Sequence, residues 1–142
     1  MSAHRDALVQ AARDAARQAH APYSGVHVGA AIRSERGAVY AGCNVENMAY
    51  PVGNCAETSA IAAGVAAEGR SLRILETAVW STDREGRPLA ASPCGACRQR
   101  LLEFAGAEGV TVHFPWQGGE LLSARIDELL PYAFTLPSRG AR

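Results

Sequence analysis

Apolar and polar positions along the chain recur with periods that predict both helices and strands. Between residues 3 and 19, apolar side chains recur at helical spacing with arginines and acids between them, which predicts an amphipathic helix. Two short apolar runs over 26–32 and 38–45 flank a polar turn and predict a β-hairpin. Gly29 and Gly42 lie inside these runs and indicate a bulge or a close approach of another backbone.

The rest of the chain continues as alternating helices and strands. An alanine-rich segment predicts a helix over 54–68 with Asn54 near its N-cap, and a continuous apolar run predicts a buried strand over 72–80. The later predicted elements are a helix over 93–104, a strand over 110–114, an edge strand over 120–123 and a short helix over 126–130. This order predicts a three-layer α/β/α fold with a mixed sheet, in a single domain over residues 1–142.

Composition and charge favour a small-molecule ligand. Hydrophobic residues make up 48% of the chain and charged residues 20%, which is typical of a globular protein. Acidic and basic residues balance at 14 each, so the chain lacks the positive charge that a nucleic-acid backbone attracts. No apolar run approaches the ~20 residues of a membrane span. We therefore expect a cytoplasmic protein that binds neither nucleic acid nor membranes, with its cysteines reduced.

Three cysteines and one glutamate form the pattern most informative about chemistry. Cys94 and Cys97 are three positions apart, so one helical turn would bring both sulfurs to the same side, and Cys55 begins another predicted helix. Helix N-termini favour thiolates, the form of cysteine that binds metal. Three protein ligands with an open fourth position are typical of catalytic zinc. The pattern predicts an open zinc site.

Glu57 stands two positions after Cys55, which suits a proton shuttle beside the metal. Residues so spaced do not share a helix face, so the arrangement requires Cys55 at the very start of its helix. A zinc-bound water has a pKa near ~7, and a neighbouring carboxylate can take its proton and pass it to a leaving amine. This chemistry suits hydrolytic attack on an amidine-like ring carbon with loss of ammonia.

Other interpretations of the cysteines stay open from the residues alone. Cys43 could complete a closed structural zinc site, although a buried free cysteine in a strand is common. A redox pair of Cys94 and Cys97 would leave Glu57 without a purpose. His27 and His113 are weaker ligand candidates, because each lies in a predicted strand.

Taken together, these motifs resemble the small homotetrameric cytidine deaminases. The similarity runs through Tyr23-Ser24, Val28–Ala31, Gly42–Asn47, Tyr50-Pro51, Cys55–Glu57, Pro93–Gln99, and Leu129–Pro131 with Phe134. The resemblance implies a central five-stranded sheet between helices. It also implies hydrolysis of cytidine or deoxycytidine to the uridine nucleoside, in a homotetramer with shared active sites.

The resemblance also implies roles for individual residues. Cys55, Cys94 and Cys97 would bind Zn²⁺, and Glu57 would shuttle protons. The implied substrate contacts are Asn44 and Glu46 with the ribose, the backbone around Ala56 with the pyrimidine, Val26 at the position that faces the base, and Tyr50 and Phe134 at positions that reach active sites across subunit boundaries.

Two positions depart from the family pattern. The family usually has a phenylalanine that stacks on the base, and here Val26 stands in its place, followed by His27 rather than proline. This predicts weaker cytidine binding or a pocket suited to a bulkier or modified base. An arginine usually follows the glutamate in three-cysteine members, whereas this chain has Thr58. Either Arg98 compensates for that charge, or the zinc-bound water is less acidic.

Alternative functions follow from these departures. A deaminase of the same fold could act on a modified cytidine or on an aminonucleoside antibiotic of the blasticidin S type. A zinc-stabilised binding protein without activity is a second alternative, which the presence of Glu57 disfavours. A deaminase of bases within RNA or DNA is disfavoured because no basic groove or aromatic stacking platform is evident.

Overall fold

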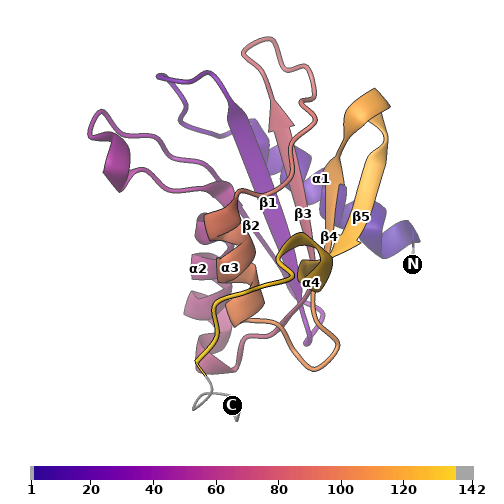
Figure 1. The fold of residues 1–142 in the computed structure, drawn as a ribbon. Coiled ribbons are helices and arrows are strands. Elements are labelled where there is room, and N and C mark those ends of the chain that lie inside the picture. The colour runs from indigo at the N-terminus through magenta and orange to yellow at the C-terminus, as the bar shows by residue number, and fades with distance from the viewer. Residues whose placement is uncertain (1, 137–142) are drawn as a thin grey trace.

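The strand-forming segments make one mixed sheet with helices on both of its faces (Figure 1). The computed structural model describes residues 2–136, so residue 1 and residues 137–142 of the predicted domain lie outside the described part. The strands are β1 (His27–Ser34), β2 (Val39–Cys43), β3 (Ile74–Thr82), β4 (Thr111–Pro115) and β5 (Leu121–Arg125). Their order is β2-β1-β3-β4-β5; the β3–β4 pair is parallel and the others are antiparallel. The predicted five-stranded α/β fold is confirmed.

Four α-helices and three short 3₁₀ turns connect these strands. The helices are α1 (Ser2–Ala16), α2 (Ala56–Glu68), α3 (Gly95–Glu103) and α4 (Ile126–Leu129), and the turns are Tyr50–Val52, Gly69–Ser71 and Gln117–Gly119. Every predicted helix and strand is present, with ends that differ by a few residues. Within the described part of the chain, no helix combines the length and apolar character needed to cross a bilayer.

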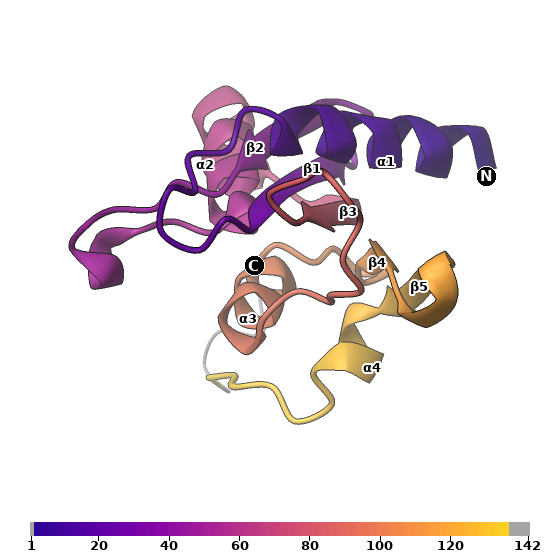
Figure 2. The same ribbon diagram turned by 90° about the horizontal axis from the view of Figure 1, so that it is seen from above.

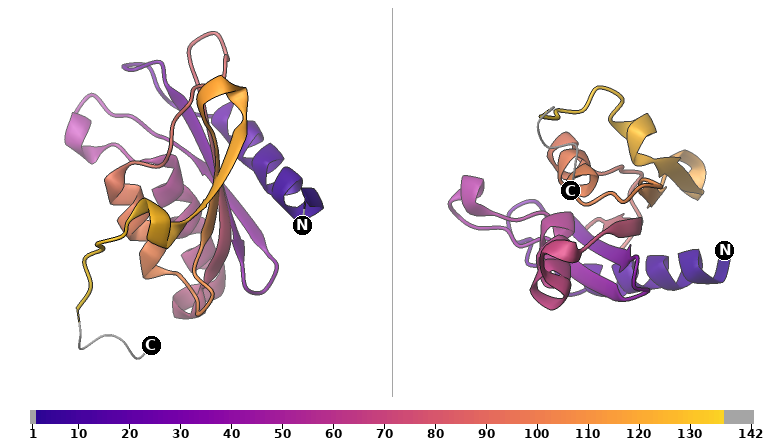
Figure 3. Two further views of the ribbon diagram at one scale, coloured as in Figure 1. Left: turned by 45° about the vertical axis from the view of Figure 1, so that its right-hand side comes forward. Right: turned by 90° about the horizontal axis from the view of Figure 1, so that it is seen from below.

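Side chains of the interior strand β1 divide between two hydrophobic cores. Ala30 and Ile32 pack in the larger core with residues of α2 and α3, whereas Ala31 packs in a smaller core against α1. Successive side chains of a strand point to opposite faces, so these two cores lie on opposite sides of the sheet. Figures 2 and 3 show α1 alone on one side and α2 and α3 together on the other.

Gly29 in β1 and Gly42 in β2 allow helices to approach the sheet closely, which is one of the two roles that the sequence indicated. A Cβ atom on Gly29 would lie 1.9 Å from the carbonyl oxygen of Ala12 in α1. A Cβ atom on Gly42 would lie 2.6 Å from the backbone nitrogen of Ala60 in α2. Both distances are too short for real Cβ contacts, so these positions require glycine. The second contact holds the first half of α2 against the sheet.

The first helix ends at Ala16, before the predicted end at residue 19. The chain turns there, and His20 pairs instead with the segment after β2: its N–H donates to the carbonyl of Asn44 at 3.1 Å, and its carbonyl accepts from Glu46 N–H at 2.8 Å. This pairing is between residues distant in sequence, so helical periodicity alone does not reveal it. It fixes the backbone from which Asn44 and Glu46 project.

Candidate functional site

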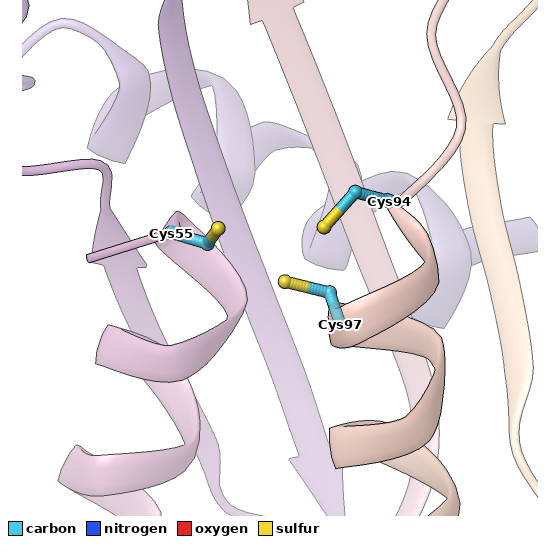
Figure 4. A group of neighbouring side chains, drawn as sticks. All are labelled: Cys55, Cys94 and Cys97. Atoms are coloured by element: carbon cyan, nitrogen blue, oxygen red, sulfur yellow. The ribbon is translucent and has the colours of Figure 1, made fainter. Parts of the chain in front are cut away.

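Three cysteine sulfurs meet where α2 and α3 begin. The Sγ atoms of Cys55, Cys94 and Cys97 all lie within 4.8 Å of one another, and Figure 4 shows the three side chains pointing toward a common centre. Cys55 comes from the start of α2, and the other two come from the start of α3. The structure thus brings together the three cysteines that the sequence analysis selected.

Cys55 and Cys94 are the N-cap residues of their helices. Cys55 therefore lies at the very start of α2, as its two-residue separation from Glu57 requires. Both have extended backbone angles, φ −73° and ψ 156° for Cys55 and φ −64° and ψ 165° for Cys94, and neither side chain caps its helix. Their sulfurs are therefore free to face beyond the helix ends, where first-turn N–H groups carry partial positive charge. The N-cap of α2 is one residue later than predicted, because Asn54 pairs with Val45 instead.

The three thiols suit a zinc ion with an open coordination position. Thiolate sulfur is a common zinc ligand, and three protein ligands leave room for water or substrate. Among residues 2–136, no fourth histidine, cysteine or acidic residue joins this group, so Cys43, His27 and His113 are not part of it. The ring of His113 contacts Ser123 and Glu76 instead. The residues present therefore fit a catalytic rather than a closed structural site.

Glu57 lies in the first turn of α2 and is buried, with 4% of its surface exposed. Burial raises the pKa of its carboxyl group, against the opposing effects of its own backbone N–H, the Cys97 thiol and the charge of Arg100. A carboxyl group with a raised pKa exchanges protons closer to neutral pH than an exposed one. Its position beside the thiols and its environment both suit proton transfer.

An arginine contacts the sulfur cluster, and it is not the one that the sequence analysis named. Arg98 donates instead to the carbonyls of Pro93 and Leu129, at 2.9 and 2.6 Å, and to Ser92 Oγ. Arg100 Nη1 donates to Cys97 Sγ at 3.5 Å. Arg98, which one of the two alternatives named as the compensating charge, therefore bonds elsewhere. The i+3 spacing of Arg100 from Cys97 on a helix was the signal that could have found it.

A cavity of about 710 Å³ opens beside the sulfur cluster. It is lined by Cys55, Cys94 and Glu57 together with five predicted substrate contacts, namely Val26, Asn44, Glu46, Tyr50 and Ala56. Phe134 is not among the lining residues of this cavity and is 71% exposed. Its backbone N–H and carbonyl both bond the side-chain amide of Gln99, at 3.2 and 2.9 Å.

Asn44 and Glu46 hold one wall of the cavity through hydrogen bonds to the segment before β1. Asn44 Oδ1 accepts from Val28 N–H and its Nδ2 donates to the Val26 carbonyl, both at 2.8 Å. The Glu46 carboxylate accepts from the N–H and hydroxyl of Ser24, which lower its pKa, and also from Tyr23 N–H. An amide and a carboxylate each have further hydrogen-bonding capacity, so both groups remain able to bind a polar ligand.

The fold and the tri-thiol site define a zinc-dependent deaminase. Residues 2–113 match the family described as the cytidine and deoxycytidylate deaminase zinc-binding region, and the chain belongs to this family. A cytidine deaminase of Sporosarcina psychrophila is 39% identical over 128 residues, which span 90% of this chain and 89% of that protein. The crystal structure of a cytidine deaminase from Burkholderia pseudomallei superposes with a TM-score of 0.78 at 38% identity, covering 91% of this chain and 98% of that one.

A relative of lower sequence identity is named for a different substrate. The blasticidin-S deaminase of Bacillus cereus is 30% identical over 114 residues, covering 77% of each chain. The relatives therefore include proteins named as cytidine deaminases and one named as a blasticidin-S deaminase.

Proposed function

We propose that this protein hydrolyses cytidine or deoxycytidine to the corresponding uridine nucleoside and ammonia. The observation that carries the proposal is the meeting of three thiols with a buried glutamate beside a cavity that Asn44 and Glu46 also line. Cys55, Cys94 and Cys97 would hold the zinc ion. The family to which the chain belongs supports both the metal and the reaction.

Glu57 is the proposed proton carrier. Bound zinc supplies a Lewis acid that lowers the pKa of a coordinated water to ~7. The Glu57 carboxylate accepts a proton from the attacking water as the new C–O bond forms at the ring carbon that bears the amine. It gives this proton to the ring nitrogen, then takes the remaining proton of the added hydroxyl group and passes it to the amine, so that the C–N bond breaks, a carbonyl group forms and ammonia leaves. Burial among the thiols excludes bulk water from this proton transfer.

Asn44 and Glu46 are the proposed ribose contacts. An amide that both donates and accepts beside an ionised carboxylate suits the hydroxyl groups of a sugar. The depressed pKa of Glu46 keeps it ionised at neutral pH, as a hydrogen-bond acceptor for a hydroxyl. Ala56 directly follows Cys55 and lines the same cavity, so its backbone suits a contact with the pyrimidine edge.

A deaminase of a modified cytidine or an aminonucleoside antibiotic is the second candidate. The observation that favours it is Val26, which gives the cavity wall an aliphatic side chain where the family usually has an aromatic ring. A substrate panel of cytidine, deoxycytidine, cytosine and blasticidin S separates the two candidates. Faster turnover of the antibiotic than of cytidine would support the second one.

We also propose a homotetramer with shared active sites. Large apolar side chains are exposed on the loop between β2 and α2 and on the segment after α4: Met48, Tyr50, Tyr132 and Phe134 are 81%, 75%, 97% and 71% exposed. The β2–α2 loop projects away from the sheet (Figures 1 and 2). Apolar groups this exposed are typical of protein interfaces. Phe134 does not line the cavity of its own chain, which suits a contact with a neighbouring subunit.

A cytoplasmic location completes the proposal. Thiol ligands must stay reduced to bind zinc, and the cytoplasm keeps cysteines in that state. Measurement of the protein and of its activity in cell fractions tests this part.

The central experiment combines metal analysis with an ammonia-release assay on wild type and Glu57→Gln. Glutamine keeps the size of the side chain but cannot carry the proton, so we expect turnover to fall at least ~100-fold with zinc retained. Glu120→Gln changes an exposed glutamate outside the cavity and serves as the matched control. Undiminished turnover in Glu57→Gln contradicts the proposed mechanism. Zinc without ammonia release from any substrate would indicate a binding protein.

A further inference from the structure

The proposed metal centre carries more negative charge than the metal supplies in positive charge. Three thiolates exceed the two charges of a zinc ion by one negative unit, and Cys97 is fully buried. A buried charge without a partner is costly, so the protein must compensate it. The N-termini of α2 and α3 contribute partial positive charge, equivalent to roughly half a unit at each helix end, which is spread over several N–H groups.

Arg100 brings a full positive charge directly to the sulfur of this buried cysteine. It follows Cys97 by three positions in α3, so the two side chains share a helix face, and its Nη1 atom donates to Cys97 Sγ at 3.5 Å. An arginine guanidinium group stays protonated throughout the pH range in which proteins are folded. The guanidinium group therefore stays charged.

The helix opposite Arg100 offers no cation at the corresponding place. A cavity of about 290 Å³ between α2 and α3 is lined by Thr58, Ile61, Gln99, Arg100, Glu103 and Phe104. Thr58 follows Glu57 directly, and its hydroxyl is buried without a hydrogen-bond partner among the described residues. The Arg98 side chain donates hydrogen bonds to two carbonyls and to Ser92 Oγ. Arg100 is thus the residue that brings positive charge to the thiols from the side of this cavity.

We propose that Arg100 is a positioning residue of the metal centre, whose guanidinium group compensates the excess thiolate charge and orients Cys97 toward the metal. This inference rests on the proposed zinc ligands. Thr58, the residue after Glu57, carries no charge in this chain, so the cationic contact with the thiols is assigned to Arg100 of α3. Arg100 acts through Cys97 and needs no contact with the substrate, so its loss should weaken metal binding first.

The test measures zinc affinity by competition with a chelator, on purified protein and without any substrate. Arg100→Gln keeps a polar side chain but removes the charge, and we expect roughly 10- to 100-fold weaker zinc binding, as for other residues that support metal ligands. Arg100→Lys keeps the charge and should recover most of the affinity. Arg70→Gln removes an exposed arginine just beyond α2 and should leave the affinity unchanged.

Moving the positive charge from Arg100 to another position distinguishes compensation of the thiolate charge from a role of Arg100 in packing. In the double variant Arg100→Gln with Thr58→Arg, the new arginine projects from α2 into the same small cavity, and we expect part of the lost affinity to return. In cobalt-loaded protein, the sulfur-to-cobalt absorption band should shift in Arg100→Gln, because one sulfur loses its hydrogen-bond donor. Circular dichroism establishes that each variant is folded.

The outcomes distinguish this inference from the proposed function. If wild type binds no zinc, the proposed function itself fails. If wild type binds zinc tightly and Arg100→Gln binds it equally well with an unshifted cobalt spectrum, the role of Arg100 is overturned and the deaminase proposal is untouched. A loss of affinity that neither lysine nor the relocated arginine reverses also overturns charge compensation.

Discussion

At the residue scale, Val26 lines the cavity from a backbone that hydrogen bonds hold in place. Its N–H donates to Ser24 Oγ at 3.0 Å, and its carbonyl accepts from Asn44 Nδ2 at 2.8 Å. Its side chain is 36% exposed and lines the cavity. The hydrogen bonds of the backbone do not depend on the side chain, so this position can change without disturbing the wall.

We predict that Val26→Phe strengthens cytidine binding. A ring at this position would stack on a pyrimidine, and aromatic pairs contribute about 0.5–1.5 kcal/mol beyond area burial, which corresponds to a roughly two- to tenfold lower KM. Steady-state kinetics with cytidine measure the change. Val39→Phe, on an exposed strand position outside the cavity, is the control. A KM equal to that of wild type would show that the aromatic position is dispensable here.

At the scale of elements, strands β1, β3, β4 and β5 align a row of polar side chains on one face of the sheet. Arg33 pairs with Glu76 on the neighbouring strand, and Glu76 also contacts His113 Nε2 at 2.8 Å. The other ring nitrogen lies 2.7 Å from Ser123 Oγ. A neutral ring satisfies both partners, with Nε2–H donating to the carboxylate and Nδ1 accepting from the hydroxyl.

His113 should make stability depend on pH. Burial lowers its pKa, and the charges of Arg5 and Arg33 lower it further, whereas in the unfolded chain the pKa is ~6.5. The unfolded chain therefore binds this proton more readily, so the stabilisation is full above ~6.5 and is lost as the pH falls through the lower folded-state pKa.

Urea unfolding at pH 7.5 and at several lower pH values tests this prediction. Wild type should lose stability on acidification more steeply than His113→Asn, which has no group that titrates there. His4→Asn changes an exposed histidine of α1 and should keep the wild-type slope. Equal slopes for wild type and His113→Asn would show that other groups cause the acid sensitivity.

At the scale of the whole molecule, the segment after α4 holds an aromatic side chain away from its own cavity. Gln99 of α3 bonds both backbone groups of Phe134, and the ring is left 71% exposed. The two hydrogen bonds hold the backbone of Phe134 in place, while most of the residue stays exposed. This arrangement supports the proposal that Phe134 completes the site of a neighbouring subunit.

Mixed oligomers test that proposal. Phe134→Ala alone and Glu57→Gln alone should each show low activity, the first because neighbouring sites lack the ring and the second because every site lacks its proton carrier. When the two variants are co-expressed, some sites combine an intact Glu57 with Phe134 from a Glu57→Gln neighbour, so activity should rise above that of either variant. Activity in co-expressed protein no greater than the average of the two variants would indicate self-contained sites.

The sequence by itself determined the order of helices and strands and the set of metal-binding thiols. Its apolar periods predicted each element, since local burial patterns follow helix and strand geometry closely. The spacing of Cys94 and Cys97, with Glu57 beside Cys55, indicated the chemistry, because few arrangements explain three thiols and a carboxylate at such intervals. The elements and the two short motifs, Cys55 with Glu57 and Cys94 with Cys97, each depend on neighbours within one or two turns of the chain.

Only the tertiary structure decided which groups meet across those elements. The first helix stops at Ala16 because His20 pairs with Asn44 and Glu46, and Arg98 is held away from the thiols because its guanidinium group donates to the carbonyl of Leu129 near the end of α4. Such contacts join residues far apart in sequence. Local propensity carries no information about them, because their energies arise only once the elements have packed together.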